Sequence, residues 1–351
     1  MTDSIIDISK GFFEEYVRPL LATRFPDEFA QMACGVWGLG SEALRLDDDL
    51  SRDHHFGLRI DAIMPLELLQ TRWPAVQAIL ESDLPREYMG HSLVERAVVG
   101  AGIAPDSLRG FLTRTIGFDH PPRTDQEWLS IPEEDVIHVI NGEVWHDPSG
   151  RFTAVRNTLN GYYPEPVRLR RLAHWCRYYS GMGVYALKRA LLRDNEYYAS
   201  VAFAKSVRWG MQMAFMLDRV YYPYDKWMLA FFKRLPRMYD RLHVIVDEAV
   251  QLSTPWDRKL ELLDRMSDQL DATMVEDGIV PPHPKFRGSP VSGYRLMEYD
   301  YYQIIRNLPF ELLDIIPEWE QVHLERSVVH YVAGLEEPAW RAALNLTEVE
   351  D

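Results

Sequence analysis

The sequence has little cysteine and no long hydrophobic run. Its 351 residues include only Cys34 and Cys176, too few for a disulfide framework or a cysteine metal site, which fits a reducing cytoplasm. No apolar stretch approaches the roughly 20 residues that a membrane span needs. The first residues carry neither a basic segment nor an uninterrupted apolar one, so we expect no signal peptide. We therefore expect a cytoplasmic protein with no membrane partner.

Positive charge is also scarce. The chain has 38 Lys and Arg against 53 Asp and Glu, a formal net charge of -15. Such a surface repels nucleic acid on average, and no basic stripe alternates with aromatic residues. Nucleic-acid polymerisation is therefore not expected. Arg168, Arg170 and Arg171 leave a tRNA substrate or an anionic pocket open, although a solvated helix face explains them at least as well.

Apolar residues, by contrast, are abundant. They make up 47% of the chain and aromatic residues 12%, a composition that predicts a packed protein, and the length predicts two domains. Residues 4–24 have the apolar spacing of an amphipathic helix, 29–39 and 58–64 read as strands, and 65–84 reads as a helix.

The next segments contain the turn signals of the first domain. We expect more helix over 88–118, a loop over 120–134, and a hairpin in which strands 136–140 and 143–146 flank Asn141-Gly142. From residue 166 onward the segments have helical periodicity. The sequence therefore predicts an α+β protein: a mixed sheet with flanking helices over 1–160, then a helical bundle domain over 161–351.

The chemistry is concentrated between Gly40 and His55. A Gly-Ser turn such as Gly40-Ser41 leaves backbone N–H groups available to phosphate oxygens. Asp53 and His55 alternate by two, so they share a face if they open the strand that continues through Asp61. Two ligands on one face could hold a divalent ion against the phosphates. The acidic run 47–49 is expected to be a solvated loop that caps the segment after it.

Four stretches carry a resemblance to a known family. They are GSEALRLDDDLSRDHHFG, GEVWHDPSGRFTAVRNTL, YYPEPVRLRRLAHW and YYPYDKW. A Gly-Ser pair, a spacer and an acid at the start of a strand resemble the DNA polymerase beta-like nucleotidyltransferase superfamily. The longer strings resemble a bacterial group of domains of unknown function within it. Together the resemblance runs from residue 35 to about residue 235.

The resemblance implies a nucleotide site with a metal. Gly40 and Ser41 would hold the phosphates of a nucleoside triphosphate, and Asp53 would bind Mg²⁺ or Mn²⁺. His55 stands where the superfamily usually has a second acid, and an imidazole suits Mn²⁺ or Zn²⁺ better than Mg²⁺. The implied reaction transfers a nucleoside monophosphate to a small-molecule or protein acceptor and releases pyrophosphate.

A third acid is expected, and three residues are candidates for it. Asp61 continues the face of Asp53 and His55 and is a candidate catalytic residue. Glu143 and Asp147 lie on or just after a later strand, and Glu143 is the candidate metal ligand. The residue types alone leave this choice open.

The second domain offers two further candidates in YYPYDKW. Lys226 would begin a helix after Pro223 and reach phosphates from the helical domain, while Tyr224 would stack on a base. A lysine lying along its neighbour Trp227 at a helix start is an equally good explanation.

Three functions are compatible with these features. The first is a nucleotidyltransferase that uses a nucleoside triphosphate and a divalent metal. The second is a catalytically impaired regulatory protein of the same fold that binds a nucleotide, which the histidine at position 55 favours. The third is an interaction protein whose helical domain is a binding surface, which leaves the cluster of Gly, Ser, Asp and His unexplained.

Overall fold

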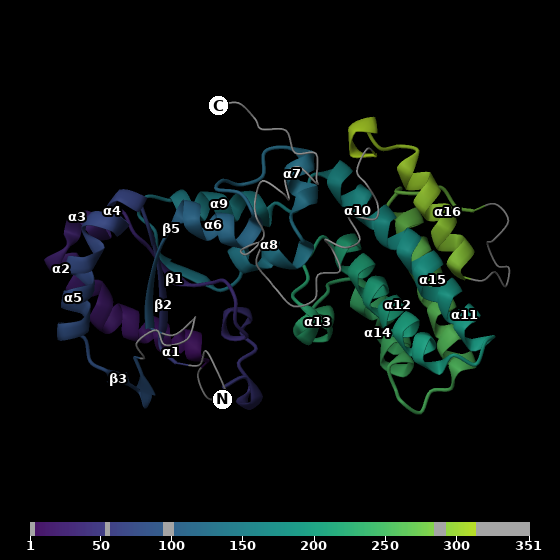
Figure 1. Ribbon diagram of the computed structural model, residues 1–351, viewed down its shortest axis with the longest axis horizontal. Coiled ribbons are helices and arrows are strands. Elements are labelled where there is room, and N and C mark those ends of the chain that lie inside the picture. Colours follow the sequence, from purple (N-terminus) through teal and green to yellow (C-terminus); the bar gives the residue numbers. More distant parts are fainter. Residues whose placement is uncertain (1–3, 53–56, 94–101, 284–292, 314–351) are drawn as a thin grey trace. The chain divides into compact units, whose positions relative to one another are not determined.

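The computed structural model describes residues 4–52, 57–93, 102–283 and 293–313. Within them the chain divides into two compact units (Figure 1). Unit 1 comprises the residues up to Pro122 together with Ile131–Gly161. Unit 2 comprises Arg123–Ser130 and the residues from Tyr162 onward. In the described part of the chain, no helix is long and apolar enough to cross a membrane.

A mixed sheet of four strands lies at the centre of unit 1, in the order β5-β2-β1-β6. Strand β1 (Ala33–Val36) runs antiparallel to both β2 (Arg59–Met64) and β6 (Glu143–His146), while β5 (Gly102–Ser107) runs parallel to β2. The register between β1 and β6 shifts at Gly35, where a Cβ atom would lie 2.0 Å from the carbonyl oxygen of Glu143. Only glycine permits this close approach.

Helices cover both faces of the sheet (Figure 1). One face packs against the N-terminal helices and α5, and the other packs against α6 and α9. The helices of unit 1 and their bounds are α1 (Ile5–Phe12), a π-helical turn (Phe13–Val17), α2 (Arg18–Arg24), α3 (Pro26–Phe29), α4 (Leu66–Thr71), α5 (Trp73–Asp83), α6 (Leu108–Ile116), α8 (Glu133–Ile140) and α9 (Arg151–Asn160). Short 3₁₀ turns lie at Glu42–Leu44 and Asp49–Arg52, and β3 (Glu87–Tyr88) pairs with β4 (His91–Ser92).

The two faces of β2 have different chemistry. Ile60, Ala62 and Met64 lie in the apolar core with the N-terminal helices and α5. Because successive side chains of a strand alternate, Arg59 and Asp61 point to the opposite face. Both are nonetheless buried. This places a charged pair inside unit 1, beside the segment that follows β1.

The predicted hairpin around Asn141-Gly142 is wrong. Residues 133–140 form helix α8, and only β6 follows the turn. Acidic residues in the first turn after Pro132 favour a helix start. The strand signal came from the β-branched residues Val136, Ile137, Val139 and Ile140 in front of Asn141-Gly142, because such residues favour strands.

Two neighbouring predictions are also wrong. The segment expected as helix over 88–118 contains the β3–β4 hairpin, strand β5 and only then α6, and residues 94–101 lie outside the described part of the chain. The loop expected over 120–134 contains α7 (Asp125–Ser130) and the start of α8. The hairpin turn uses positive φ at Met89 and Gly90, and Met89 gives no sequence signal for that conformation.

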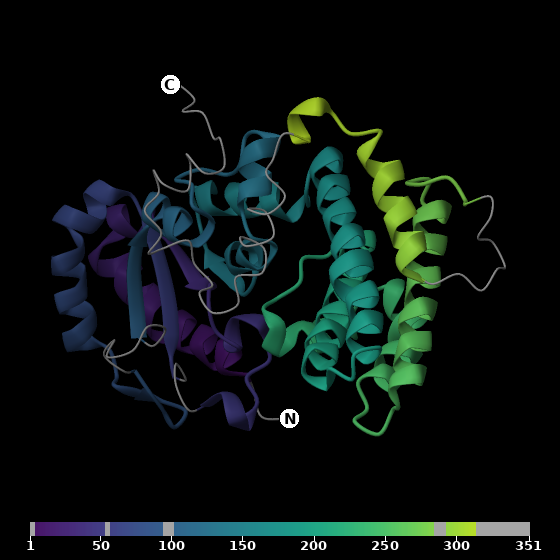
Figure 2. The same ribbon diagram turned by 45° about the vertical axis from the view of Figure 1, so that its right-hand side comes forward.

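Unit 2 is helical and has its own apolar core. Figure 2 shows α10, α12, α15 and α16 running side by side. Its helices are α7, α10 (Glu165–Tyr178), a π-helical turn (Tyr179–Tyr185), α11 (Ala186–Leu191), α12 (Glu196–Leu217), α13 (Asp225–Phe232), α14 (Met238–Ala249), α15 (Trp256–Glu276), α16 (Gly293–Ile305) and a 3₁₀ turn (Phe310–Leu312). The predicted α+β class, a mixed sheet with flanking helices followed by further helices, is confirmed. The part of the expected helical domain from residue 314 onward lies outside the described residues.

Candidate functional site

The Gly-Ser loop is the segment that leaves β1, from Trp37 to Ala43. Gly38 and Gly40 both have positive φ, of 88° and 131°, which side-chain-bearing residues rarely adopt. A Cβ atom at Gly40 would lie 2.2 Å from Oε1 of Glu42, so any larger residue at this position would force the Glu42 carboxylate to move. Ser41 is buried and starts the short turn Glu42–Leu44. The predicted turn is therefore present.

Arg59 supports the loop from β2. Its Nε donates to Asp61 Oδ2 at 3.0 Å, and its Nη1 donates to Glu42 Oε1 at 2.6 Å and to the Leu39 carbonyl at 2.8 Å. Its Nη2 donates to the carbonyl oxygen of Trp37. Burial alone would lower the pKa of Arg59, but the Asp61 and Glu42 carboxylates raise it above its ordinary value. The guanidinium therefore stays charged and joins the sheet to both ends of the loop.

Asp61 completes this buried network. Its Oδ2 accepts the Trp37 N–H at 3.0 Å in addition to the Arg59 guanidinium. Only 8% of the residue is exposed. These contacts hold the first residue of the loop, and a catalytic role for Asp61 stays a prediction.

The turn at Asn141-Gly142 supports the loop from the other side. The Asn141 side chain accepts the Gly38 N–H at 2.9 Å and donates to the Gly38 carbonyl at 2.7 Å. The buried His138 ring lies 3.2 Å from the same carbonyl, and the Gly142 N–H donates to the Ala43 carbonyl at 2.9 Å. The side-chain amide of Asn141 thus pairs with both backbone groups of Gly38, as a residue of a neighbouring strand would.

Arg156 of α9 fixes that turn. Its guanidinium donates to the carbonyl oxygens of Asn141 at 2.8 Å, Ile140 at 2.7 Å and Gly142 at 3.4 Å. Burial lowers the pKa of Arg156 to about 10. The loop therefore rests on two arginines, Arg59 from the sheet and Arg156 through the turn.

Glu143, the candidate metal ligand, already has cationic partners. It forms ion pairs with Arg45 and with Lys10, the latter at 3.2 Å, and accepts the Trp145 indole N–H at 3.1 Å. Partial burial would raise the pKa of Glu143, but Arg45 and Lys10 lower it overall. Its carboxylate is therefore ionised at neutral pH, at the end of β6 that pairs with Val36.

The remaining predicted residues lie either outside the described residues or in unit 2. Asp53 and His55 lie outside the described residues, so their predicted metal and catalytic roles stay predictions. Tyr224 and Lys226 lie in unit 2 at the start of α13, with the Lys226 ammonium 4.9 Å from the centre of the Trp227 ring. Their roles in binding a nucleotide also stay predictions.

Several smaller expectations have a clear outcome. Asp48 caps the turn Asp49–Arg52 by accepting the Ser51 N–H at 2.9 Å, which confirms the predicted cap. Asp147, one of the three candidates for the third acid, caps α9 by accepting the Thr153 N–H at 2.8 Å. Both cysteines are free and buried, as expected.

The arginines of α10 are buried, which excludes the solvated helix face. Arg168 pairs with Glu165, and Arg171 donates to the carbonyls of Trp128 and Leu129. Arg170 donates to the Leu312 carbonyl at 3.0 Å. These bonds join the segments of unit 2 to one another.

Arg59, Glu42, Asn141 and Arg156 were not identified from the sequence. One signal was present: Arg59 lies two residues before Asp61 in a mostly apolar strand, so the two side chains must share one face of the strand. Asn141 and Arg156 gave no such signal, because their partners are backbone groups: Gly38, 103 residues from Asn141, and the turn 14 to 16 residues before Arg156.

These features define the class of protein as an α+β domain whose mixed sheet presents a buttressed Gly-Ser loop, combined with a helical unit. Residues 128–228 match the family described as a domain of unknown function (DUF4037). That range contains three of the four recognised stretches, and the match confirms the predicted resemblance to such a group. The GSEALRLDDDLSRDHHFG segment lies before the matched range.

The comparison with curated proteins and the comparison with solved structures had different outcomes. No curated protein matches the chain. Among solved structures, the chain is similar to a nucleotidyltransferase-like protein from Exiguobacterium sibiricum 255-15. The similarity has a TM-score of 0.38 and 12% sequence identity, and covers 75% of this chain and 77% of the other.

Proposed function

We propose that unit 1 binds a nucleoside triphosphate at the Gly40-Ser41 loop and transfers its nucleoside monophosphate to a small-molecule or protein acceptor, releasing pyrophosphate. The observation that carries this proposal is the support of the loop. Arg59 and Asn141 bond to it from two sides, and its two positive-φ glycines fix its path. Phosphoryl transfer depends mainly on positioning and charge stabilisation, which a preorganised loop supplies.

The proposed metal site requires the predicted ligands at Asp53 and His55. Among the residues that the structure describes, no group of three His, Cys, Asp or Glu could hold a metal ion. Asp53, His55 and Glu143 would supply two carboxylates and one imidazole, a donor set that suits Mn²⁺ as well as Mg²⁺. Glu143 is ionised, as a ligand must be, and would exchange Lys10 or Arg45 for the metal. The ion would neutralise phosphate charge.

The other residues of the loop region have positioning roles in this proposal. Asp61 and Glu42 keep Arg59 charged, and Arg59 binds the carbonyls of Trp37 and Leu39. With those carbonyls bound, the negative phosphates meet fewer unpaired acceptors in the loop. Ser41 would lie against the phosphates because it follows Gly40 directly.

The test is nucleotidyl transfer from α-³²P-labelled ATP, GTP, CTP and UTP in the presence of Mg²⁺ or Mn²⁺. We expect pyrophosphate release by the wild type and its loss in Asp53→Ala, while Asp27→Ala, an exposed aspartate on α3, behaves as the wild type. Equal activity in the wild type and Asp53→Ala, or no release with any nucleotide, would contradict the catalytic proposal. If the wild type binds nucleotide without transfer and His55→Asp gains transfer, the chain is a regulatory nucleotide-binding protein instead.

A further inference from the structure

A cavity lies in unit 1 at the opposite end of β1 from the Gly-Ser loop. It has a volume of about 360 Å³, within the range of small-molecule sites. Strand β1 enters beside it at Ala33 and leaves at Val36 toward the loop. The parallel strands β2 and β5 end at the cavity with Met64 and Ser107. This site is therefore separate from the one proposed for the nucleotide.

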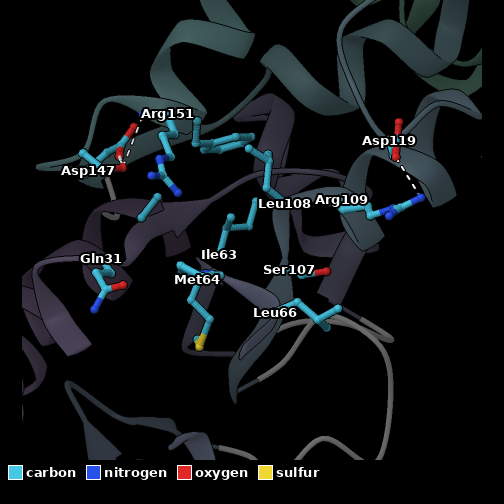
Figure 3. A pocket seen from close by; sticks show the side chains of 14 residues that line it. Gln31, Ile63, Met64, Leu66, Ser107, Leu108, Arg109, Asp119, Asp147 and Arg151 are labelled. Atoms are coloured by element: carbon cyan, nitrogen blue, oxygen red, sulfur yellow. Dashed lines mark hydrogen bonds and ion pairs between the residues drawn. The ribbon is translucent and has the colours of Figure 1, made fainter. Parts of the chain in front are cut away.

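The floor of the cavity is apolar. Side chains of Ile63, Met64, Leu66 and Leu108 cover it (Figure 3). Phe152 also lines the cavity. Phe152 is itself fixed, because its ring packs 4.6 Å from the centre of the Trp37 ring. An occupant with an apolar body would bury surface here, and burial contributes roughly 25 cal/mol per Å².

The rim of the cavity carries charges, and most of them already have partners. Arg109 pairs with Asp119 at 2.9 Å on one side. On the other side, Asp147 accepts hydrogen bonds from the Ser149 hydroxyl at 3.0 Å and from the Thr153 N–H at 2.8 Å. These groups are stabilised without a ligand.

Arg151 is the exception. Figure 3 shows its side chain pointing into the cavity, and within the described part of the chain no hydrogen bond or ion pair joins its guanidinium to another residue. It is the first residue of α9, where the helix dipole adds a partial positive charge. A guanidinium in this position binds a carboxylate through two parallel hydrogen bonds.

We propose that this cavity binds a small amphiphilic anion: a carboxylate held by Arg151, attached to an aliphatic or aromatic body that lies on the apolar floor. The site is independent of the proposed nucleotidyltransferase activity, since none of its lining residues belongs to the Gly-Ser loop or its supports. Its occupant is selected by one charge and by apolar surface, not by a nucleobase.

The test compares two series of probes on the full-length protein by isothermal titration calorimetry. Straight-chain carboxylates from acetate to octanoate are titrated beside the primary alcohols of equal carbon number. We expect affinity to rise with chain length in both series, and each longer carboxylate to bind about tenfold more tightly than its alcohol, the gain of one charge-assisted interaction. Equal affinities in the two series, or no binding of either, would overturn the proposal.

Variants then assign the binding to this cavity. Arg151→Gln is expected to lower carboxylate affinity about tenfold, to the level of the alcohol, and to leave alcohol binding unchanged. Leu66→Trp fills the floor from a half-exposed position and is expected to weaken both series. Arg193→Gln, which removes an exposed arginine outside the cavity, is the matched control. Unchanged binding in both Arg151→Gln and Leu66→Trp would contradict this location.

Discussion

Replacing Arg59 by methionine tests the network that holds the Gly-Ser loop. The substitution keeps most of the side-chain volume but leaves the Asp61 and Glu42 carboxylates buried without their cation, and frees the carbonyls of Trp37 and Leu39. Removing one partner of a buried ion pair costs about 3–5 kcal/mol. A whole protein is stable by only about 5–15 kcal/mol, so unit 1 would lose a large part of its stability.

Native-state hydrogen exchange of the β1 and β2 amides measures this loss within unit 1. A cost of about 3 kcal/mol corresponds to exchange that is about 100-fold faster for the amides protected by global unfolding of the unit. As a control, Arg24→Met breaks the exposed pair with Asp83, which is worth about 0–1 kcal/mol. Adding Glu42→Gln and Asp61→Asn to Arg59→Met removes the uncompensated charges and is expected to restore part of the protection. Exchange in Arg59→Met within threefold of the control, or no recovery in the triple variant, would refute this account of the network.

Three further predictions concern the supports of the loop and the core of unit 2. Gly142→Ala would place a Cβ atom 1.8 Å from the Val36 carbonyl oxygen, so we expect a thermal midpoint lower than that of Gly150→Ala, where the added Cβ meets nothing within 4 Å; equal midpoints would contradict the close approach. Arg156→Gln is expected to weaken nucleotide binding while leaving the helix content of unit 2 unchanged; unaltered binding in a folded variant would argue against its role. Burial, and then the nearby Asp271, raise the pKa of Asp300 well above its ordinary value. The pKa of Asp300 is higher in the folded than in the unfolded protein, so protonated Asp300 contributes to the stability of the fold. This contribution is complete below about pH 3.9, the pKa of an unfolded aspartate, and is lost as pH rises through the folded pKa. Chemical denaturation at several pH values should therefore show that Asp300→Asn depends less on pH than the wild type does.

The sequence predicts the parts of the fold that depend on local pattern. Strand β2 is readable because it is mostly apolar between turn signals, and the long helices of unit 2 have regular apolar spacing. Helix α8 is not readable, because its buried β-branched run directly before Asn-Gly is typical of a strand. Asn-Gly gave the hairpin signal, yet Asn141 has φ of -71° and uses its side chain to bind Gly38.

The candidate site likewise contains residues that can be recognised from the sequence and residues that cannot. Gly40 and Ser41 are recognisable because glycine is required where φ is positive, and the structure shows that conformation at Gly40. The supports at Asn141 and Arg156 depend on backbone acceptors about 100 residues away or on a turn between elements, which no local pattern reports. Arg59 is intermediate: its spacing from Asp61 indicates a shared face, but not that both are buried.

The central claim is that a nucleotide and a metal ion meet at the Gly-Ser loop. A crystal structure of the full-length protein with a non-hydrolysable nucleoside triphosphate and Mn²⁺ tests it directly, because Mn²⁺ has a measurable anomalous signal. Our account predicts the triphosphate against Gly40 and Ser41, and one anomalous peak bonded to Asp53 and His55. A nucleotide bound elsewhere, or a peak without either residue as its ligand, would contradict it.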